Sequence, residues 1–201
     1  QIPEIKNEGI PVDLNPERPL EIYYLEASPG RGMASFLGHS MLRLKFCQED
    51  GYDDSSLEDC PRGKTQDVVV SYAAYVTSKK PSPIKGLFGG YPSTLSIMPY
   101  ENVRYNYGQR QNRALISFKL HLSASQKKRL VYRILEDYWS YKGNYKFVSN
   151  NCVVEARDAI QSVLGQTNTA LFRRIKTPQM LRKILIEGGL TDERPSMVDP
   201  S

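Results

Sequence analysis

One cysteine has the type and position that nucleophilic catalysis requires. Cys152 follows the polar stretch Ser149-Asn150-Asn151 and opens an apolar-periodic segment that predicts a helix. Free backbone N–H groups and the helix dipole at such a position favour a thiolate, and they can bind an oxyanion during acyl transfer. We therefore predict that Cys152 is a nucleophile, with Asn150 and Asn151 as cap residues or further donors. The alternative interpretation is a small buried cysteine that begins a core helix.

A thiol nucleophile needs a base, and the chain offers two histidines, His39 and His121. His121 shares its predicted strand face with Ser117 and Lys119, which indicates a solvated histidine. His39 follows Gly38 at the start of another predicted strand. A strand histidine that faces a helix-opening cysteine is the papain-like arrangement, here with the histidine first in the chain. We therefore predict His39 as the base.

A third group should orient the imidazole. The strand expected beside His39 carries Ser71 and Tyr72, whose side chains point to opposite faces, so at most one of them can face the histidine. Asp67, at the start of the same strand, is another candidate. The sequence leaves the choice among these residues open.

The elements that must position these residues follow from periodicity. Period-two alternation predicts strands, and period-3.6 spacing together with cap residues predicts helices. The strands cover Glu21–Ala27, His39–Cys47, Asp67–Thr77 and Ala114–Leu122, and the helices cover Ser123–Tyr141, Cys152–Leu164 and Pro178–Glu187. The expected class is α+β, with residues 1–20 as an extended arm, 21–190 as a single catalytic domain and 191–201 as a flexible tail.

A proline- and glycine-rich segment at residues 78–99 is predicted to be a loop. It carries many large apolar side chains, which exposed loops rarely hold without a use. This composition indicates a lid or a segment that enters a lipid interface, around Ile84 to Met98. The alternative is a loop that packs on its own core.

Composition narrows the class of partner. The 201 residues are 40% hydrophobic, and the net charge of +5 favours an anionic surface such as phospholipid headgroups, peptidoglycan or nucleic acid. Basic residues are scattered, and no zinc-finger or RNP-like pattern occurs, so we expect no nucleic-acid binding. No apolar run reaches the length of a membrane span. The chain begins at Gln1 and not at methionine, which indicates that an N-terminal piece has been removed.

The cysteine positions predict a disulfide and a free thiol. Cys47 and Cys60 flank a polar, acidic loop, and a bridge between them would stabilise the fold by roughly 3 kcal/mol. Such a pairing implies an oxidising compartment and leaves Cys152 as the odd thiol. The alternative is three reduced cysteines in the cytosol. Neither spacing resembles a zinc-ligand pair, so no metal and no cofactor are expected.

Several motifs together resemble a known family. They are Leu37-Gly38-His39-Ser40-Met41-Leu42-Arg43, Lys85-Gly86-Leu87-Phe88-Gly89-Gly90-Tyr91-Pro92, Arg113 before a strand, and Tyr145 and Phe147 leading to Asn151-Cys152. This pattern, over roughly residues 20–165, resembles the Lnb-type periplasmic domain family of bacterial lipoprotein N-acyltransferases and relatives. The resemblance implies a permuted papain-like (NlpC-type) fold, with an antiparallel sheet packed against the helix that starts at the cysteine.

The same resemblance implies an activity and a location. Cys152 would take an acyl chain from a phospholipid as a thioester and pass it to the N-terminus of a lipoprotein, with His39 as the base. The domain would be periplasmic or otherwise extracytoplasmic and would contact a membrane surface. The expected oxyanion and substrate-binding residues are Asn151, Val153, Arg43, Tyr145, Leu87 and Phe88, although the resemblance assigns no role to Arg43. Val153-Val154 stands where family members often have Thr or Ser, which bears on the acceptor.

Other functions use the same residues. A cysteine amidase or peptidase that acts on cell-wall peptides would need the same Cys152–His39 pair, with water as the acceptor. A non-enzymatic, disulfide-stabilised binding domain would keep Cys152 as a structural residue only.

Overall fold

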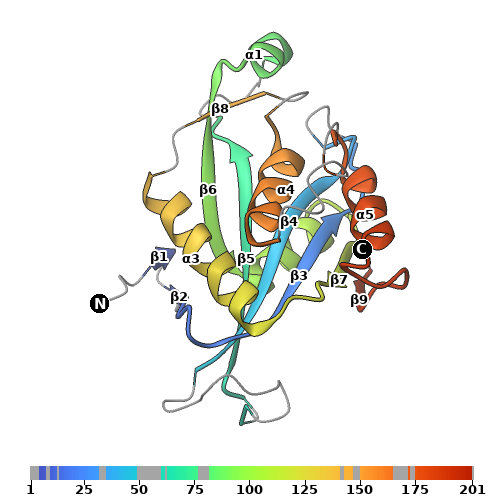
Figure 1. Ribbon diagram of the computed structural model, residues 1–201. Helices are drawn as coiled ribbons and strands as arrows, with labels where there is room; N and C mark the ends of the chain where they lie inside the picture. The colour runs from blue at the N-terminus through green and yellow to red at the C-terminus, as the bar shows by residue number, and fades with distance from the viewer. Residues whose placement is uncertain are drawn as a thin grey trace.

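The computed structural model describes residues 5–7, 10–12, 14–31, 35–48, 60–61, 63–76, 82–140, 143–146, 150–164, 172 and 175–200. Its centre is a seven-stranded antiparallel sheet in the order β8-β6-β5-β4-β3-β7-β9 (Figure 1). The strands are β3 (Pro19–Ala27), β4 (His39–Cys47), β5 (Thr65–Ala74), β6 (Tyr91–Pro99), β7 (Leu115–Lys119), β8 (Gly143–Tyr145) and β9 (Met197–Asp199). The α+β class is thereby confirmed.

Helices pack on both faces of the sheet, long helices on one face and short ones on the other. One face packs against α3 (Ala124–Ser140), α4 (Cys152–Val163) and α5 (Pro178–Glu187), as Figure 1 shows. Alternation in β4 turns Leu42, Leu44 and Phe46 toward these helices, as the sequence predicts, and all three are buried. The other face carries α2 (Tyr100–Arg104) and the π-helical turn η2 (Tyr105–Gln109), which pack over Met41 and Val69.

Side-chain caps fix where the long helices begin. Before α3, the Ser123 hydroxyl accepts from the Gln126 N–H at 3.3 Å, and Gln126 Oε1 accepts from the Ser123 N–H at 2.8 Å. This reciprocal pair is the predicted capping box. Thr177 caps α5 in the same way, since its hydroxyl accepts from the Met180 N–H at 3.3 Å.

The segment expected to be the loop 78–99 is partly regular. It contains the short helix α1 (Pro83–Phe88) and the strand β6, which pairs with β5 from Ser93 to Pro99. Pro99 is tolerated at the end of β6 because the second neighbour, β8, pairs only with Tyr91 to Ser93, so the rest of the strand lies at an open side of the sheet. Ile97 is fully buried. The interpretation as a loop is therefore wrong for β6.

The chain ends also differ from expectation. Residues 1–20 contain the antiparallel pair β1 (Ile5–Asn7) and β2 (Ile10–Val12) and the start of β3. Within residues 191–201, expected to be a flexible tail, β9 extends the sheet by pairing with β7. Asp199 accepts a hydrogen bond from Tyr100 and forms an ion pair with Arg104 at 3.1 Å. These polar contacts attach β9 to α2, although the composition of residues 191–201 alone indicates a flexible tail.

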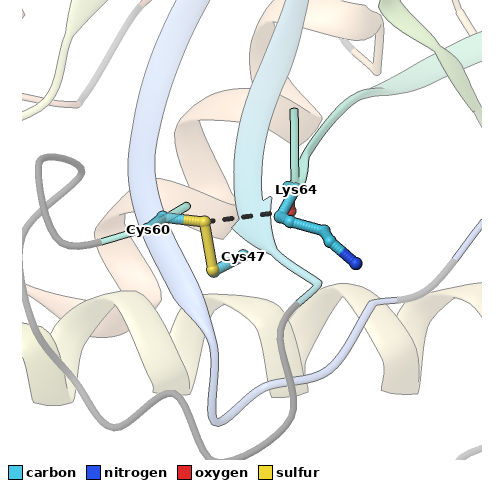
Figure 2. Close-up of a disulfide and its surroundings, with 3 residues drawn as sticks. All are labelled: Cys47, Cys60 and Lys64. Atoms are coloured by element: carbon cyan, nitrogen blue, oxygen red, sulfur yellow. Dashed lines mark hydrogen bonds between the residues drawn. A yellow bond between two sulfur atoms is a disulfide. The ribbon is translucent and has the colours of Figure 1, made fainter. Parts of the chain in front are cut away.

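The Cys47–Cys60 disulfide is confirmed (Figure 2). Its Cα atoms are 5.9 Å apart, and both cysteines are buried beside Leu20. Cys47 ends β4 opposite Thr65 of β5, so the bridge lies at the closed end of the β4–β5 hairpin. The free thiol in the described part of the chain is Cys152.

Candidate active site

The site lies where two central strands part. The β4–β5 ladder ends at the pair Leu42–Val70. Beyond it β4 continues back to His39 beside β3, while β5 continues to Ala74 beside β6. Figure 1 shows the two strands separating toward the end of the sheet where α1 and β8 lie, with α4 in front of them. Backbone groups of β4 beyond Leu42 therefore need partners other than β5.

The first turn of α4 supplies the sulfur at this position. Asn151 is the N-cap, because its Oδ1 accepts from the Val153 N–H at 3.1 Å and from the Val154 N–H at 3.2 Å. Its Nδ2 donates to the Lys176 carbonyl at 3.3 Å, which ties α4 to the segment before α5. Cys152 is the first helical residue and is only 5% exposed.

The surroundings of Cys152 favour its thiolate. Burial alone raises the pKa of the thiol, but the attraction of His39 and a hydrogen bond with its imidazole oppose this effect. Further hydrogen bonds come from the Ser40 backbone and the Tyr145 hydroxyl. Together they lower the pKa of Cys152 to about 7, so a substantial thiolate fraction is present at neutral pH.

Ser71 holds the imidazole from the opposite strand. The Ser71 hydroxyl lies 2.8 Å from His39 Nε2. Because Nε2 is engaged in this way, Nδ1 is the ring nitrogen left for the sulfur of Cys152. The Tyr72 hydroxyl points to the other face, where it donates to Asp137 Oδ2 of α3 at 2.8 Å. Of the candidates for the third group, the structure brings Ser71 to the imidazole.

Gly38 sets the position of His39 along the chain. Its φ of +91° lies in the left-handed region, which L side chains rarely adopt. A Cβ built there would lie 2.8 Å from the Ala27 carbonyl oxygen. Because this oxygen belongs to the backbone, a side-chain rotation cannot remove the clash. Glycine is therefore required for the tight entry from β3 into β4 that presents His39.

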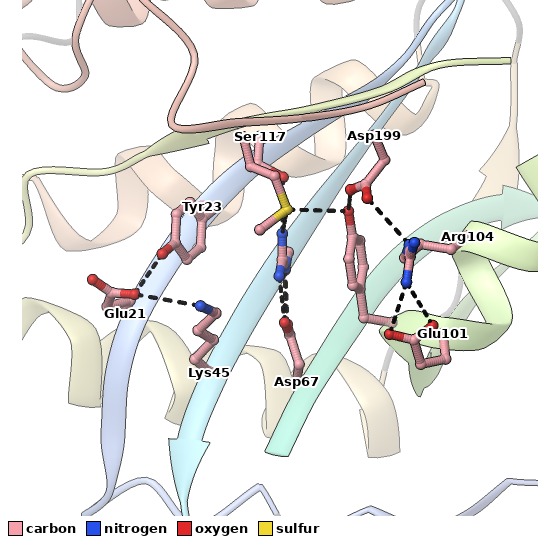
Figure 3. A network of polar contacts seen from close by, with 11 residues as sticks. Glu21, Tyr23, Lys45, Asp67, Glu101, Arg104, Ser117 and Asp199 are labelled. Carbon is pink, nitrogen blue, oxygen red and sulfur yellow. Dashed lines mark hydrogen bonds and ion pairs between the residues drawn. The ribbon is translucent and has the colours of Figure 1, made fainter. Parts of the chain in front are cut away.

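Other residues predicted for the site lie elsewhere. Arg43 faces the same side as His39 but about 13 Å further along β4, at ~3.3 Å per residue. There it is paired with Asp67, whose Oδ1 accepts from Arg43 Nε at 2.8 Å (Figure 3). Asp67 is thus engaged by Arg43 and not by the imidazole.

The remaining predicted residues have structural or peripheral positions. The Val153 N–H donates to Asn151 Oδ1, and the Val153 side chain is buried in the core, so both have structural roles at the start of α4. Phe88 is 80% exposed on α1. The Leu87 side chain lies outside the described residues. His121, expected to be solvated, is 44% exposed, and its Nε2 is 3.4 Å from Asp192 Oδ2.

One residue at the site carried no sequence signal. The Tyr107 ring is stacked on the His39 imidazole, with ring centroids 6.0 Å apart and an angle of 10° between the planes. Tyr107 lies in the π-helical turn η2, where neither a period of 2 nor one of 3.6 applies. Sequence patterns that rest on those periods cannot assign it to the site.

The arrangement contains the groups that acyl transfer through a thiolate requires. Two groups that can donate lie beside the sulfur, the Cys152 N–H and the Tyr145 hydroxyl, and at present the Cys152 N–H donates to the Tyr145 oxygen at 3.3 Å. A carbonyl oxygen bound between them would be stabilised as it gains negative charge. Among the described residues, no group of three or more His, Cys, Asp or Glu side chains is arranged to hold a metal ion.

Comparison with known proteins gave a family match. The family described as the Lnb N-terminal periplasmic domain matches residues 14–188, which include every residue of the site described above. Neither the comparison with curated proteins nor the comparison with solved structures returned a match. Within the described residues, no helix combines the length and apolar character that a membrane span needs.

The lowered pKa of Cys152 predicts a pH profile for thiol alkylation. The thiolate is the reactive form, so the rate with iodoacetamide should rise through a midpoint near pH 7. In His39→Ala, burial still raises the pKa of the Cys152 thiol, but the imidazole that lowers it is gone. The alkylation midpoint should therefore move above that of an ordinary thiol. His121→Ala is the matched control and should keep the profile of the unmodified protein. A midpoint near 8.5 or higher in the unmodified protein would contradict the site.

The position of Gly38 predicts a selective effect of an added methyl group. Gly38→Ala should lower stability by roughly 1–3 kcal/mol through backbone strain and should slow Cys152 alkylation, because His39 must shift. Gly63→Ala is the control, since Gly63 also has a left-handed φ of +80° but no atom within 4 Å of an added Cβ. It should carry strain without slowing alkylation. Equal alkylation rates in both variants would show that Gly38 does not position His39.

Proposed function

The chain belongs to the Lnb N-terminal periplasmic domain family, and from that premise we propose that it is a thiol-dependent acyltransferase with Cys152 as its nucleophile. The acyl donor is a phospholipid and the acceptor is the N-terminus of a bacterial lipoprotein. A periplasmic domain family indicates an extracytoplasmic location, where the Cys47–Cys60 disulfide is stable. The observation that carries the proposal is that Cys152 at the start of α4 and His39, held by Ser71, meet where β4 and β5 part, so that the imidazole lowers the pKa of the buried thiol.

The first half-reaction forms the thioester. His39 takes the thiol proton, and the Cys152 thiolate attacks the ester carbonyl carbon of the phospholipid. The developing oxyanion accepts hydrogen bonds from the Cys152 N–H, which turns from the Tyr145 oxygen to the substrate, and from the Tyr145 hydroxyl. The carbon–oxygen ester bond then breaks, and the imidazolium returns its proton to the departing alkoxide, which leaves as a lysophospholipid. The acyl group remains on the sulfur.

The second half-reaction uses the same groups, now with the Cys152 thiolate as the leaving group. The amine of the acceptor attacks the thioester carbonyl, and His39 accepts a proton from the attacking nitrogen. The carbon–sulfur bond breaks, the thiolate of Cys152 is restored, and an amide is released. Ser71 keeps its hydrogen bond to Nε2 throughout, so that Nδ1 exchanges the proton with sulfur, leaving group and amine.

The fold order supports a permuted papain-like arrangement. In this arrangement a strand presents the histidine, and the cysteine opens a helix that packs on the same sheet. Here β4 presents His39 and α4 begins at Cys152, and α4 packs over β4 and β5. The histidine precedes the cysteine in the chain, as a permutation requires.

Side chains around the site support contact with a phospholipid surface. The elements that meet at this end of the sheet carry exposed apolar residues, which are Phe36, Leu37, Tyr75, Val76, Phe88 and Met180. Exposed basic residues accompany them, namely Arg31, Lys85, Lys146 and Lys176. Apolar side chains can enter the headgroup layer while the basic side chains pair with lipid phosphates. This combination brings a phospholipid ester within reach of Cys152.

The proposal predicts an acyl adduct on Cys152. The protein is incubated with vesicles of phosphatidylethanolamine and phosphatidylglycerol and examined by intact-mass spectrometry. We expect a mass increase of one fatty acyl group on Cys152, removed by neutral hydroxylamine as thioesters are. His39→Ala should slow its formation by roughly 10²–10⁴-fold, and Cys152→Ala should abolish it, while His121→Ala should leave it unchanged.

The acceptor is tested by discharge of that adduct. A synthetic lipopeptide with a free N-terminal S-diacylglyceryl cysteine should remove the acyl group and gain it as an amide. Absence of any adduct, together with cleavage of muropeptides by the same protein, would replace acyl transfer with peptide hydrolysis. Absence of both reactions would leave the binding-domain interpretation.

A further inference from the structure

Tyr107 lies against the imidazole from the face of the sheet opposite α4. The two rings are nearly parallel, and their centroid distance of 6.0 Å is within the range of offset stacking. His39 is only partly buried, so the Tyr107 ring covers a side of the imidazole that water would otherwise reach. The hydroxyl of Ser71 fixes one nitrogen of the imidazole, and the Tyr107 ring fixes its plane.

Arg113 in turn holds Tyr107. Its guanidinium carbon lies 4.8 Å from the centre of the Tyr107 ring. The side chain is 4% exposed, and its hydrogen bonds go to neutral oxygens: Nε donates to the Ser28 carbonyl at 2.6 Å, Nη2 to the Ala27 carbonyl at 3.4 Å and Nη1 to Gln111 Oε1 at 3.0 Å. None of these partners is a carboxylate. Arg113 is therefore a buried cation whose charge is not cancelled by the groups it contacts.

We propose that Tyr107 and Arg113 are positioning residues that stabilise the thiolate–imidazolium pair of Cys152 and His39. The π-face of Tyr107 attracts the imidazolium that forms when the thiol proton moves to His39. Arg113 fixes the Tyr107 ring by a cation–π contact, and its buried positive charge attracts the thiolate through space. This inference deepens the proposed function and rests on the same Cys152–His39 pair.

Electrostatic coupling across the site agrees with this assignment. Burial lowers the pKa of Arg113, while attraction to Tyr107 and to Cys152 opposes that effect. Burial raises the pKa of Tyr107 to about 12, attraction to Arg113 lowers it, and repulsion by Cys152 raises it, so the phenol is neutral throughout the relevant pH range. Arg113 and Cys152 thus interact as a cation and a developing anion.

Titratable groups that face the pair come from several elements. They are Tyr24 of β3, Tyr107 of η2, Arg113 before β7 and Tyr145 of β8. The phenols of Tyr24 and Tyr145 stay protonated because burial raises their pKa. Glu26 of β3 interacts with Tyr24 and with Arg182 of α5. Arg113 is thus a permanent charge that contacts the Tyr107 ring and interacts with Cys152 through space.

The test separates ring electronics from packing. Phenylalanine and then di- and trifluorinated phenylalanines are placed at position 107, and the pH profile of Cys152 alkylation is measured. The shape of the ring is retained, so the fold should be retained, whereas its π-face becomes less negative with each fluorine. We expect Tyr107→Phe to keep the alkylation midpoint near pH 7. From phenylalanine to the trifluorinated ring, the midpoint should then rise stepwise by a total of roughly half to one pH unit. An identical midpoint across the series would overturn the proposal.

Variants of Arg113 test the charge. Arg113→Met should raise the alkylation midpoint, and Arg113→Lys should restore part of the shift because it keeps the charge but not the planar stack. Tyr105→Leu is the control, since Tyr105 lies in the same turn but is 54% exposed. A purely structural role of Arg113 predicts equal midpoints for the Lys and Met variants, which would contradict the proposal.

Failure of this inference is distinguishable from failure of the proposed function. If the unmodified protein shows no alkylation midpoint near 7, the Cys152–His39 pair itself is wrong. If that midpoint is present and neither series moves it, the pair stands and the positioning role of Tyr107 and Arg113 is refuted. Neither readout requires the natural acyl donor.

Discussion

The separation of β4 from β5 beyond Leu42 is the constraint on which the candidate site depends. A continuous ladder would occupy the backbone of Ser40 with β5 and leave no room for a helix-borne sulfur. Because the strands part, the Ser40 backbone bonds the sulfur of Cys152 instead, and Ser71 of β5 reaches across to the imidazole of His39. The site is thus built at an interruption in the sheet.

A polar network that includes Asp67, Ser117 and Asp199 lies on the face of the sheet opposite α4 (Figure 3). Arg43 is 3% exposed, and its guanidinium carbon lies 3.7 Å from the centre of the Tyr100 ring. Tyr100 opens α2 and donates to Asp199 of β9, and η2 continues α2 as far as Tyr107. Arg43, which has no contact role in the proposed chemistry, therefore anchors the segment that brings Tyr107 to His39. Removing one partner of such a buried pair leaves an uncompensated charge.

Local patterns predicted the parts of the site that depend on local physics. Asn151 before an apolar period marks a helix start, and its side chain does cap α4, so the position of Cys152 followed from sequence. The alternation in His39–Cys47 and the spacing of Cys47 and Cys60 are also local features, and they predicted strand β4 and the disulfide. Ser71 and Tyr72 could not be told apart, because the choice depends on strand register and on which face α2 and η2 cover. Tyr107 and β9 could not be predicted, since a π-helical turn has no periodic signal and the attachment of Asp199 depends on contacts with residues almost a hundred positions away.

The central claim is that the sulfur of Cys152, the imidazole of His39 and two oxyanion donors meet at one point. A crystal structure of the protein alkylated at Cys152 by a long-chain acyl chloromethyl ketone tests this most directly. We expect the ketone oxygen to lie within hydrogen-bonding distance of the Cys152 N–H and the Tyr145 hydroxyl, with His39 Nδ1 facing the modified sulfur. An adduct whose carbonyl oxygen points into the α3–α4 core, with His39 turned away from the sulfur, would contradict it.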